Sequence, residues 1–74
     1  MSQYLVSYFT DEIDDAVHTN IIDCRDMRRP TDEDILGRAF GVLELASILN
    51  RPVPAWDYLV VHLGDRDITR RRYR

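Results

Sequence analysis

The side chains of this sequence that could hold a metal ion are mostly acidic. Four acids fall within one stretch of five residues: Asp11, Glu12, Asp14 and Asp15. A calcium-binding EF-hand loop needs a central glycine and a terminal glutamate at fixed offsets, and this stretch has neither. Zinc requires three or four nitrogen or sulfur ligands, usually at short paired spacings, which His18, Cys24 and His62 do not provide. We therefore expect no metal and no other cofactor.

Nucleophilic catalysis also lacks its usual sequence setting. Neither Ser7 nor Ser47 stands in a G-x-S-x-G motif. All ten basic residues are arginine, and the absence of lysine excludes the phosphate-binding P-loop and Schiff-base chemistry. We predict that the protein is not an enzyme.

The elements that position these residues are short strands around one helix. Residues 4–9 and residues 18–24 are rich in β-branched and aromatic side chains, and the acidic loop between them makes them the two strands of a hairpin. The apolar run at residues 56–63 predicts a third strand in a central position of the sheet.

The helix signal is the strongest in the sequence. Thr31 suits the N-cap, Asp34 stands three residues later as in a capping box, and Asp32 and Glu33 favour the positive end of the helix dipole. Apolar residues recur with helical spacing from residue 35 to residue 49. Asn50 and the prolines that follow it end the helix.

This order predicts an α+β fold, β-β-α-β, with a three-stranded sheet and one helix packed on one face, formed by residues 1–64. A right-handed crossover would return the third strand parallel to the second strand or, by skipping over it, to the first strand. We favour the arrangement beside the first strand, which leaves Ile21 and Ile22 on an edge. The helix then covers a core of sheet residues: Leu5, Phe9, Ile21, Leu59, Val61 and Leu63. Strand alternation places the other set on the uncovered face: Tyr4, Val6, Tyr8, Tyr58, Val60 and His62.

The length of 74 residues and the net charge of −3 describe one small acidic domain. The longest apolar stretch is too short to span a bilayer, residues 1–10 do not resemble a signal peptide, and the single cysteine cannot form an internal disulfide. We expect a cytoplasmic protein.

Residues 65–74 are predicted to form a flexible, arginine-rich C-terminal tail. Its last residues combine guanidinium groups, which pair with phosphate, and an aromatic ring, which stacks on a base: Arg70, Arg71, Arg72, Tyr73 and Arg74. A small nucleic-acid-binding module is therefore an alternative function, although the acidic remainder of the chain repels the same polyanion.

Two surfaces are candidates for protein contacts. Six carboxylates of the acidic loop and the helix start predict a surface for a partner protein with a basic patch: Asp11, Glu12, Asp14, Asp15, Asp32 and Glu33. A second helix stripe carries two glycines that cost helix stability unless another backbone approaches them: Gly37, Gly41, Leu45 and Ile48. We expect a homodimer formed through this stripe or through the uncovered sheet face; the alternative is that the glycines are simply tolerated.

Two family resemblances extend this interpretation. The segment Ser7-Tyr8-Phe9-Thr10-Asp11 resembles the first strand of the Cas2-like and VapD-like ribonucleases, which implies a ferredoxin-like fold and an active-site role for Asp11. The order of residues 4–9, residues 18–22, the helix that opens at Thr31 and residues 58–61 resembles small bacteriophage or prophage proteins of β-β-α-β layout. Some proteins of that kind are anti-CRISPR or other anti-defence inhibitors that occupy basic nucleic-acid-binding surfaces. This second resemblance implies a phage-borne inhibitor of a host complex, and it agrees with our first hypothesis of a non-enzymatic interaction protein.

Overall fold

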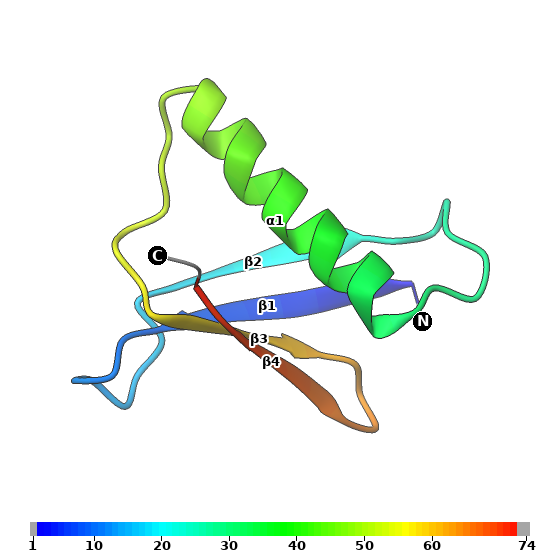
Figure 1. Cartoon of the computed structure of the whole chain (residues 1–74), viewed down its shortest axis with the longest axis horizontal. Coiled ribbons are helices and arrows are strands. Elements are labelled where there is room, and N and C mark those ends of the chain that lie inside the picture. The colour runs from blue at the N-terminus through cyan, green and yellow to red at the C-terminus, as the bar shows by residue number, and fades with distance from the viewer. Residues whose placement is uncertain (1, 73–74) are drawn as a thin grey trace.

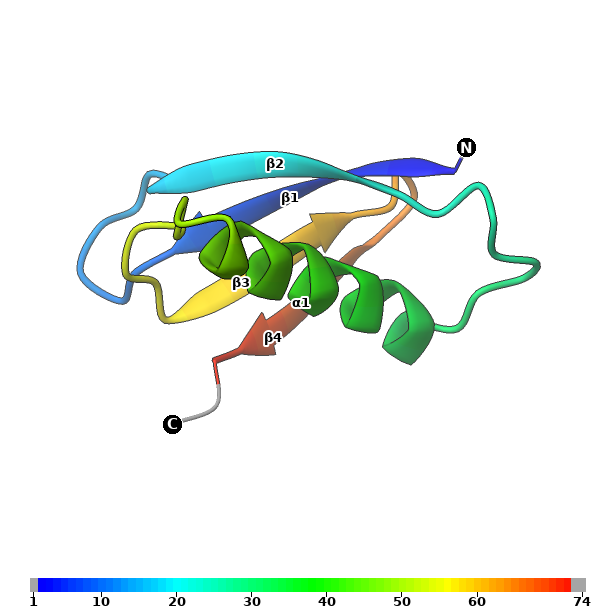
Figure 2. The same ribbon diagram turned by 90° about the horizontal axis from the view of Figure 1, so that it is seen from above.

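Four strands and one helix make up the fold. The computed structural model describes residues 2–72. Its elements are β1 (Gln3–Phe9), β2 (His18–Asp23), α1 (Asp32–Ile48), β3 (Tyr58–His62) and β4 (Asp67–Arg71). The strands form one antiparallel sheet in the order β2-β1-β3-β4, and α1 lies over one face of it (Figures 1 and 2). The predicted α+β class, with one helix packed on one face of a sheet, is confirmed.

The predicted number of strands is wrong, because the arginine-rich segment supplies a fourth. β4 pairs antiparallel with β3 through a turn at residues 63–66, in which Gly64 adopts a φ of 98°. A single buried apolar side chain, Ile68, anchors β4 to the core. Residues 67–71, which we assigned to a flexible tail, therefore form an edge of the sheet.

The order of the first three strands follows the arrangement that we favoured, but the expected parallel pairing is wrong, because β3 runs antiparallel to β1. β1 and β2 form an antiparallel hairpin, so a strand that returns in the direction of β2 is antiparallel to β1. β3 pairs with β1, with Val6 opposite Val61 and Tyr8 opposite Leu59. β2 lies at the edge of the sheet that is farthest from β4, as predicted for Ile21 and Ile22.

The side-chain alternation of β1 and β2 is opposite to the predicted one. Val6, Tyr8 and Ile22 are buried beneath α1, whereas Leu5 and Ile21 are exposed on the open face of the sheet. Both faces of β1 carry apolar residues, so its pattern alone does not select a face. Cross-strand pairing selects it, because Val6 and Tyr8 lie opposite the buried residues of β3. Of the predicted core, Leu59 and Val61 are buried and Leu63 packs partly against them.

The uncovered face consequently differs from the predicted one. Tyr4, Val6 and Tyr8 belong to the helix side of the sheet, where Tyr8 donates a hydrogen bond to Oδ1 of Asn20 at 3.1 Å. Phe9 lies on the open face instead, and its ring stacks on Tyr58 with the ring centroids 5.3 Å apart.

Both ends of α1 form as predicted. Thr31 Oγ1 accepts the backbone N–H of Asp34, and Asp34 Oδ2 accepts the backbone N–H of Thr31, which completes a capping box. At the other end Asn50 takes a φ of 59°, and the N–H groups of Asn50 and Arg51 donate to the carbonyls of Ser47 and Ala46. Within residues 2–72, no helix is long and apolar enough to cross a membrane.

Candidate binding groove beside the helix

The six predicted partner-binding carboxylates do not form one surface. Figure 1 shows the loop between β1 and β2, which carries Asp11, at the end of the sheet opposite to the start of α1, which carries Asp32 and Glu33. Three of the six are bound within the chain: Asp11 to Arg71, Asp32 to Arg66 and Glu33 to Arg70. The hydrogen bonds from Arg66 lower the pKa of the Asp32 carboxyl. The other three make no ion pair with a residue of the described chain: Glu12, Asp14 and Asp15.

The predicted nucleic-acid-binding side chains of residues 70–72 do not lie on one surface, because successive residues of β4 point to opposite faces of the sheet. Arg70 and Arg72 point to the helix side of the sheet, where Arg70 pairs with Glu33 and the guanidinium of Arg72 lies 5.4 Å from the centre of the Trp56 ring. Arg71 points to the open face, where it lies over Tyr58 and binds Asp11 at 2.6 Å. Tyr73 and Arg74 lie outside the described residues. The strand therefore presents no continuous row of free guanidinium groups to a phosphate backbone.

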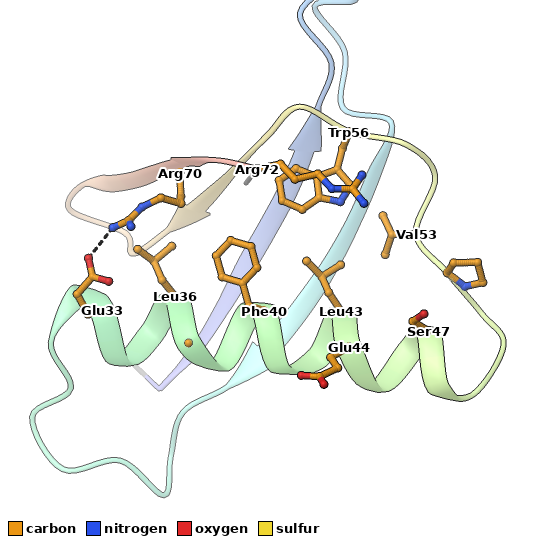
Figure 3. A pocket seen from close by; sticks show the side chains of 12 residues that line it. Glu33, Leu36, Phe40, Leu43, Glu44, Ser47, Val53, Trp56, Arg70 and Arg72 are labelled. Carbon is orange, nitrogen blue, oxygen red and sulfur yellow. Dashed lines mark hydrogen bonds and ion pairs between the residues drawn. The ribbon is translucent and has the colours of Figure 1, made fainter. Parts of the chain in front are cut away.

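A groove of about 600 Å³ opens between α1, β4 and the chain segment that leads into β3. Figure 1 shows the reason, because α1 rises away from the sheet toward its C-terminal end. The arginine pairs of Asp32 and Glu33 hold the first turn of the helix to β4 and to the turn before it. Farther along, Leu36, Phe40 and Leu43 point from the helix toward Trp56 and Arg72 across the groove (Figure 3).

The lining of the groove combines an apolar floor with charged sides. Val53 and Pro52 close it at the end of the helix, and Trp56 forms its inner wall. The centres of the Phe40 and Trp56 rings lie 6.2 Å apart, so the apolar part of the lining is largely aromatic.

Arg72 makes no ion pair with another described residue, and its guanidinium group lies over the ring of Trp56. Glu44 adds a carboxylate on the helix side of the groove. A groove of this size and composition is suited to a bulky apolar group with a negative charge placed near Arg72, on the side away from Glu44.

A second hollow, of about 540 Å³, adjoins the groove beyond the ring of Trp56. Trp56 and Arg72 line both spaces, and the second also contains Glu12 and Ile13 of the loop between β1 and β2. Ile13 is exposed although it is a large apolar residue. The concave region thus extends from α1 to the acidic loop.

The predicted self-association stripe is exposed along the helix. Leu45 and Ile48 retain 54% and 73% of their accessible surface. A Cβ atom built at Gly37 or Gly41 meets nothing within 4 Å. The two glycines therefore make no close contact with another part of the described chain. Gly37 forms part of the groove lining.

A hydrogen-bonded row of three polar side chains crosses the open face of the sheet. Ser7 Oγ lies 3.0 Å from His62 Nε2, and His62 Nδ1 lies 3.2 Å from Asp67 Oδ1. A neutral imidazole satisfies both contacts when Nδ1 donates to Asp67 and Nε2 accepts from the Ser7 hydroxyl. The order of groups matches that of a serine-hydrolase triad.

The setting of this row does not favour acyl transfer. Ser7 lies in β1, which is hydrogen-bonded to strands on both sides, so its backbone N–H is used in the sheet rather than free to stabilise an oxyanion. Neither hollow contains any of the three residues. Ser47 lines the groove, and no histidine that could act as a base is among the described residues of that lining. Cys24 is buried, and burial raises the pKa of its thiol.

The resemblance to Cas2-like and VapD-like ribonucleases implies an active-site role for Asp11. Its carboxylate binds Arg71, and its backbone N–H donates to Asp57 Oδ2 at 2.8 Å. The chain passes from β1 through a loop directly into β2, where the Cas2-like and VapD-like families have a helix. In the described chain, no three His, Cys, Asp or Glu side chains approach closely enough to hold a metal ion.

Sequence reasoning assigned the groove residues elsewhere. Phe40 and Leu43 belong to the apolar helix residues between positions 35 and 49, and they do pack partly against the core as well as lining the groove. Trp56 was expected to begin the third strand. The one signal for the groove is the Pro52-Val53-Pro54 segment, which stops the chain from returning directly beneath the end of the helix. No known protein family, curated protein or solved structure matches this chain significantly.

Proposed function

We infer that this protein is a non-enzymatic interaction module that binds a segment of a partner protein in the groove between α1 and β4. The observation that supports the proposal is the composition of the groove, where Phe40, Leu43 and Trp56 line a concave apolar space beside Arg72, whose guanidinium group makes no ion pair within residues 2–72. The best-fitting segment places a bulky apolar side chain on the rings and a carboxylate against Arg72.

The acidic loop has a supporting role in this proposal. Glu12 and Ile13 line the neighbouring hollow, so a segment longer than the groove would run toward the loop. The loop carboxylates of Glu12, Asp14 and Asp15 would then attract basic residues of the partner and speed the partner's approach. That the partner belongs to a host defence complex stays a prediction of the phage-protein resemblance.

A random-peptide display library tests the proposal without a known partner. We expect the immobilised chain to select peptides that share a large apolar residue close to an acidic one. Val53→Arg, which fills the groove with a charge, should abolish their binding, and Arg72→Gln should weaken it selectively for acidic peptides. Ile21→Arg is the matched control, because Ile21 is exposed on the open face of the sheet. Peptides without an apolar anchor, or binding that survives Val53→Arg, would refute the groove as the binding site.

A hydrolase is the competing function, and the row from Ser7 to Asp67 is the only feature that favours it within the described chain. A fluorophosphonate probe, which labels activated serines, distinguishes the two functions. We expect no label at Ser7, for lack of an oxyanion-binding donor. Labelling that disappears in His62→Ala would overturn the non-enzymatic proposal.

A further inference from the structure

The outer edge of β4 presents free hydrogen-bonding groups. The N–H of Leu63 donates to the carbonyl of Arg66, and the N–H of Arg72 donates to the carbonyl of Asp57. Alternate residues of a strand direct their backbone groups to the same side, so Ile68 and Arg70 also face β3. The N–H and C=O groups of the other three residues point away from the sheet: Asp67, Thr69 and Arg71. Among residues 2–72, no strand pairs with this edge.

The side chains along this edge are self-complementary. An antiparallel pair of β4 strands with Thr69 opposite Thr69 sets Asp67 of each copy opposite Arg71 of the other. All three residues are exposed, and each of these pairs exchanges two backbone hydrogen bonds. Within its own chain Asp67 contacts His62 and Arg71 binds Asp11, but their side chains stay 57% and 64% exposed, so each can also face a charge of the second copy. We propose that two copies of this chain pair through β4 in this register and form a dimer with one continuous antiparallel sheet.

Charge selects this register over its neighbours. A shift of two residues in one direction sets Arg70 opposite Arg70 of the second copy. The same shift in the other direction sets Asp67 opposite Thr69. Arg71 then faces Asp65 of the turn instead of Asp67 of the strand. This shift also sets Arg66 opposite Arg70 of the second copy. Just beyond the strand, Arg72 comes opposite Arg66 of the second copy, and the bond between Arg66 and Asp32 reduces that repulsion.

The symmetry of this contact has a consequence for the groove. The two-fold axis is perpendicular to the sheet, so both helices lie on the same side. The two grooves then flank the seam between the strands and form one trough, with α1 of each copy as its walls. The trough rests on the proposed function, whereas the dimer itself does not.

Sedimentation equilibrium of the full chain, at micromolar to millimolar concentration, tests the dimer. We expect twice the mass of the chain for the natural sequence. Arg71→Asp, which sets carboxylates opposite each other, should give the monomer mass, and the exchange of both charges in Asp67→Arg/Arg71→Asp should restore the dimer. Circular dichroism establishes that each variant is folded.

A second pair of variants separates the edge from other surfaces. Thr69→Pro removes an outward N–H without touching the bonds to β3, and it should give a monomer. Val53→Arg blocks the groove and should leave the dimer intact, so a failure of the proposed groove function is distinguishable from a failure of the dimer. A monomer at every concentration, a dimer that persists in both Arg71→Asp and Thr69→Pro, or a charge exchange that stays monomeric would overturn the proposal.

Discussion

The two halves of α1 are attached to the sheet in different ways. In the first half, Ile35, Leu36 and Ala39 are buried, and the arginine pairs of Asp32 and Glu33 connect the first turn to the β4 hairpin. In the second half no residue is fully buried, the last turn has no basic residue, and Leu45, Ile48 and Leu49 are exposed. The groove follows the helix from Glu33 to Ser47, and the residues of the second half that line it are Leu43, Glu44 and Ser47.

This difference distinguishes the helix residues that stabilise the core from those that remain available to bind a partner. A chain of 74 residues cannot bury all of its apolar surface. Three of the six large exposed apolar residues of the described chain lie on the second half of the helix or at its C-cap, namely Leu45, Ile48 and Leu49, and the other three lie on the open sheet face and in the acidic loop. Phe40 and Leu43 are partly buried between the core and the groove, and Trp56 is buried. Substitutions should therefore affect stability in the first half and binding in the second.

The largest expected effect is a loss of stability from Ile35→Ala. The Ile35 side chain is buried in the core and does not line the groove, so its truncation should leave a cavity that costs about 2–5 kcal/mol in the free energy of unfolding. Leu45→Ala, in the exposed half, should change it by less than about 0.5 kcal/mol. Urea titration followed by circular dichroism measures both. Equal losses at the two sites would contradict the division of the helix.

Much of the fold could be predicted because its signals are local. Thr31 and Asp34 determine the start of the helix through side chains three residues apart, and Asn50 ends it by adopting a positive φ. The hairpin and the position of β3 beside β1 follow from short apolar segments and general topology. β4 was missed because its single buried residue, Ile68, is surrounded by charges, although Gly64-Asp65 is a turn signal.

The candidate site could not be predicted because it depends on tertiary geometry. The tilt of α1 decides that Phe40 and Leu43 line a groove instead of a closed core, and no local pattern encodes that tilt. In the same way, the strand conformation of residues 67–71 separates Arg70 from Arg71 and pairs each with an acid that is distant in the sequence. The side of the sheet on which Leu5 lies was determined by its neighbours in β3.

The next largest effect is expected at the helix cap. Thr31→Ala removes the acceptor of the Asp34 N–H and should cost about 1 kcal/mol in the free energy of unfolding. Thr31→Ser keeps the hydroxyl group and is the matched control. Thermal unfolding of the two variants should give clearly separate midpoints, and coincident midpoints would show that the first turn is held by its arginine pairs alone.

Gly41→Ala should act in the opposite direction and stabilise the chain. The new methyl group meets nothing within 4 Å and lowers the backbone entropy of the unfolded state, with a gain of up to about 1 kcal/mol. The measurement is the urea midpoint at two protein concentrations. A loss of stability that grows with concentration would instead place a second copy against the Gly37, Gly41, Leu45 and Ile48 stripe.

The smallest effect expected is a loss of stability in acid, which we attribute to carboxylates at the start of α1 and at the end of β2. Hydrogen bonds from Arg66 lower the pKa of Asp32, and those from Arg25 lower the pKa of Asp23 to about 2. An aspartate carboxyl group in the unfolded chain has a pKa of about 3.9. As the pH falls, the unfolded state therefore takes up protons at a higher pH than the folded state does. The stabilisation is therefore complete above about pH 4 and declines as the pH falls toward the folded-state values.

Variants of single carboxylates identify where this acid sensitivity originates. The urea midpoint, measured from about pH 5 to about pH 2, should fall less steeply in Asp32→Asn than in the natural sequence, because one group with a lowered pKa is gone. Glu44→Gln is the control on the free half of the helix, where the carboxylate makes no ion pair with another described residue, and its profile should match the natural one. All of these side chains are largely exposed, so the differences are small and should shrink further in high salt. An Asp32→Asn profile as steep as the natural one would mean that the bond to Arg66 contributes no stability at the start of the helix.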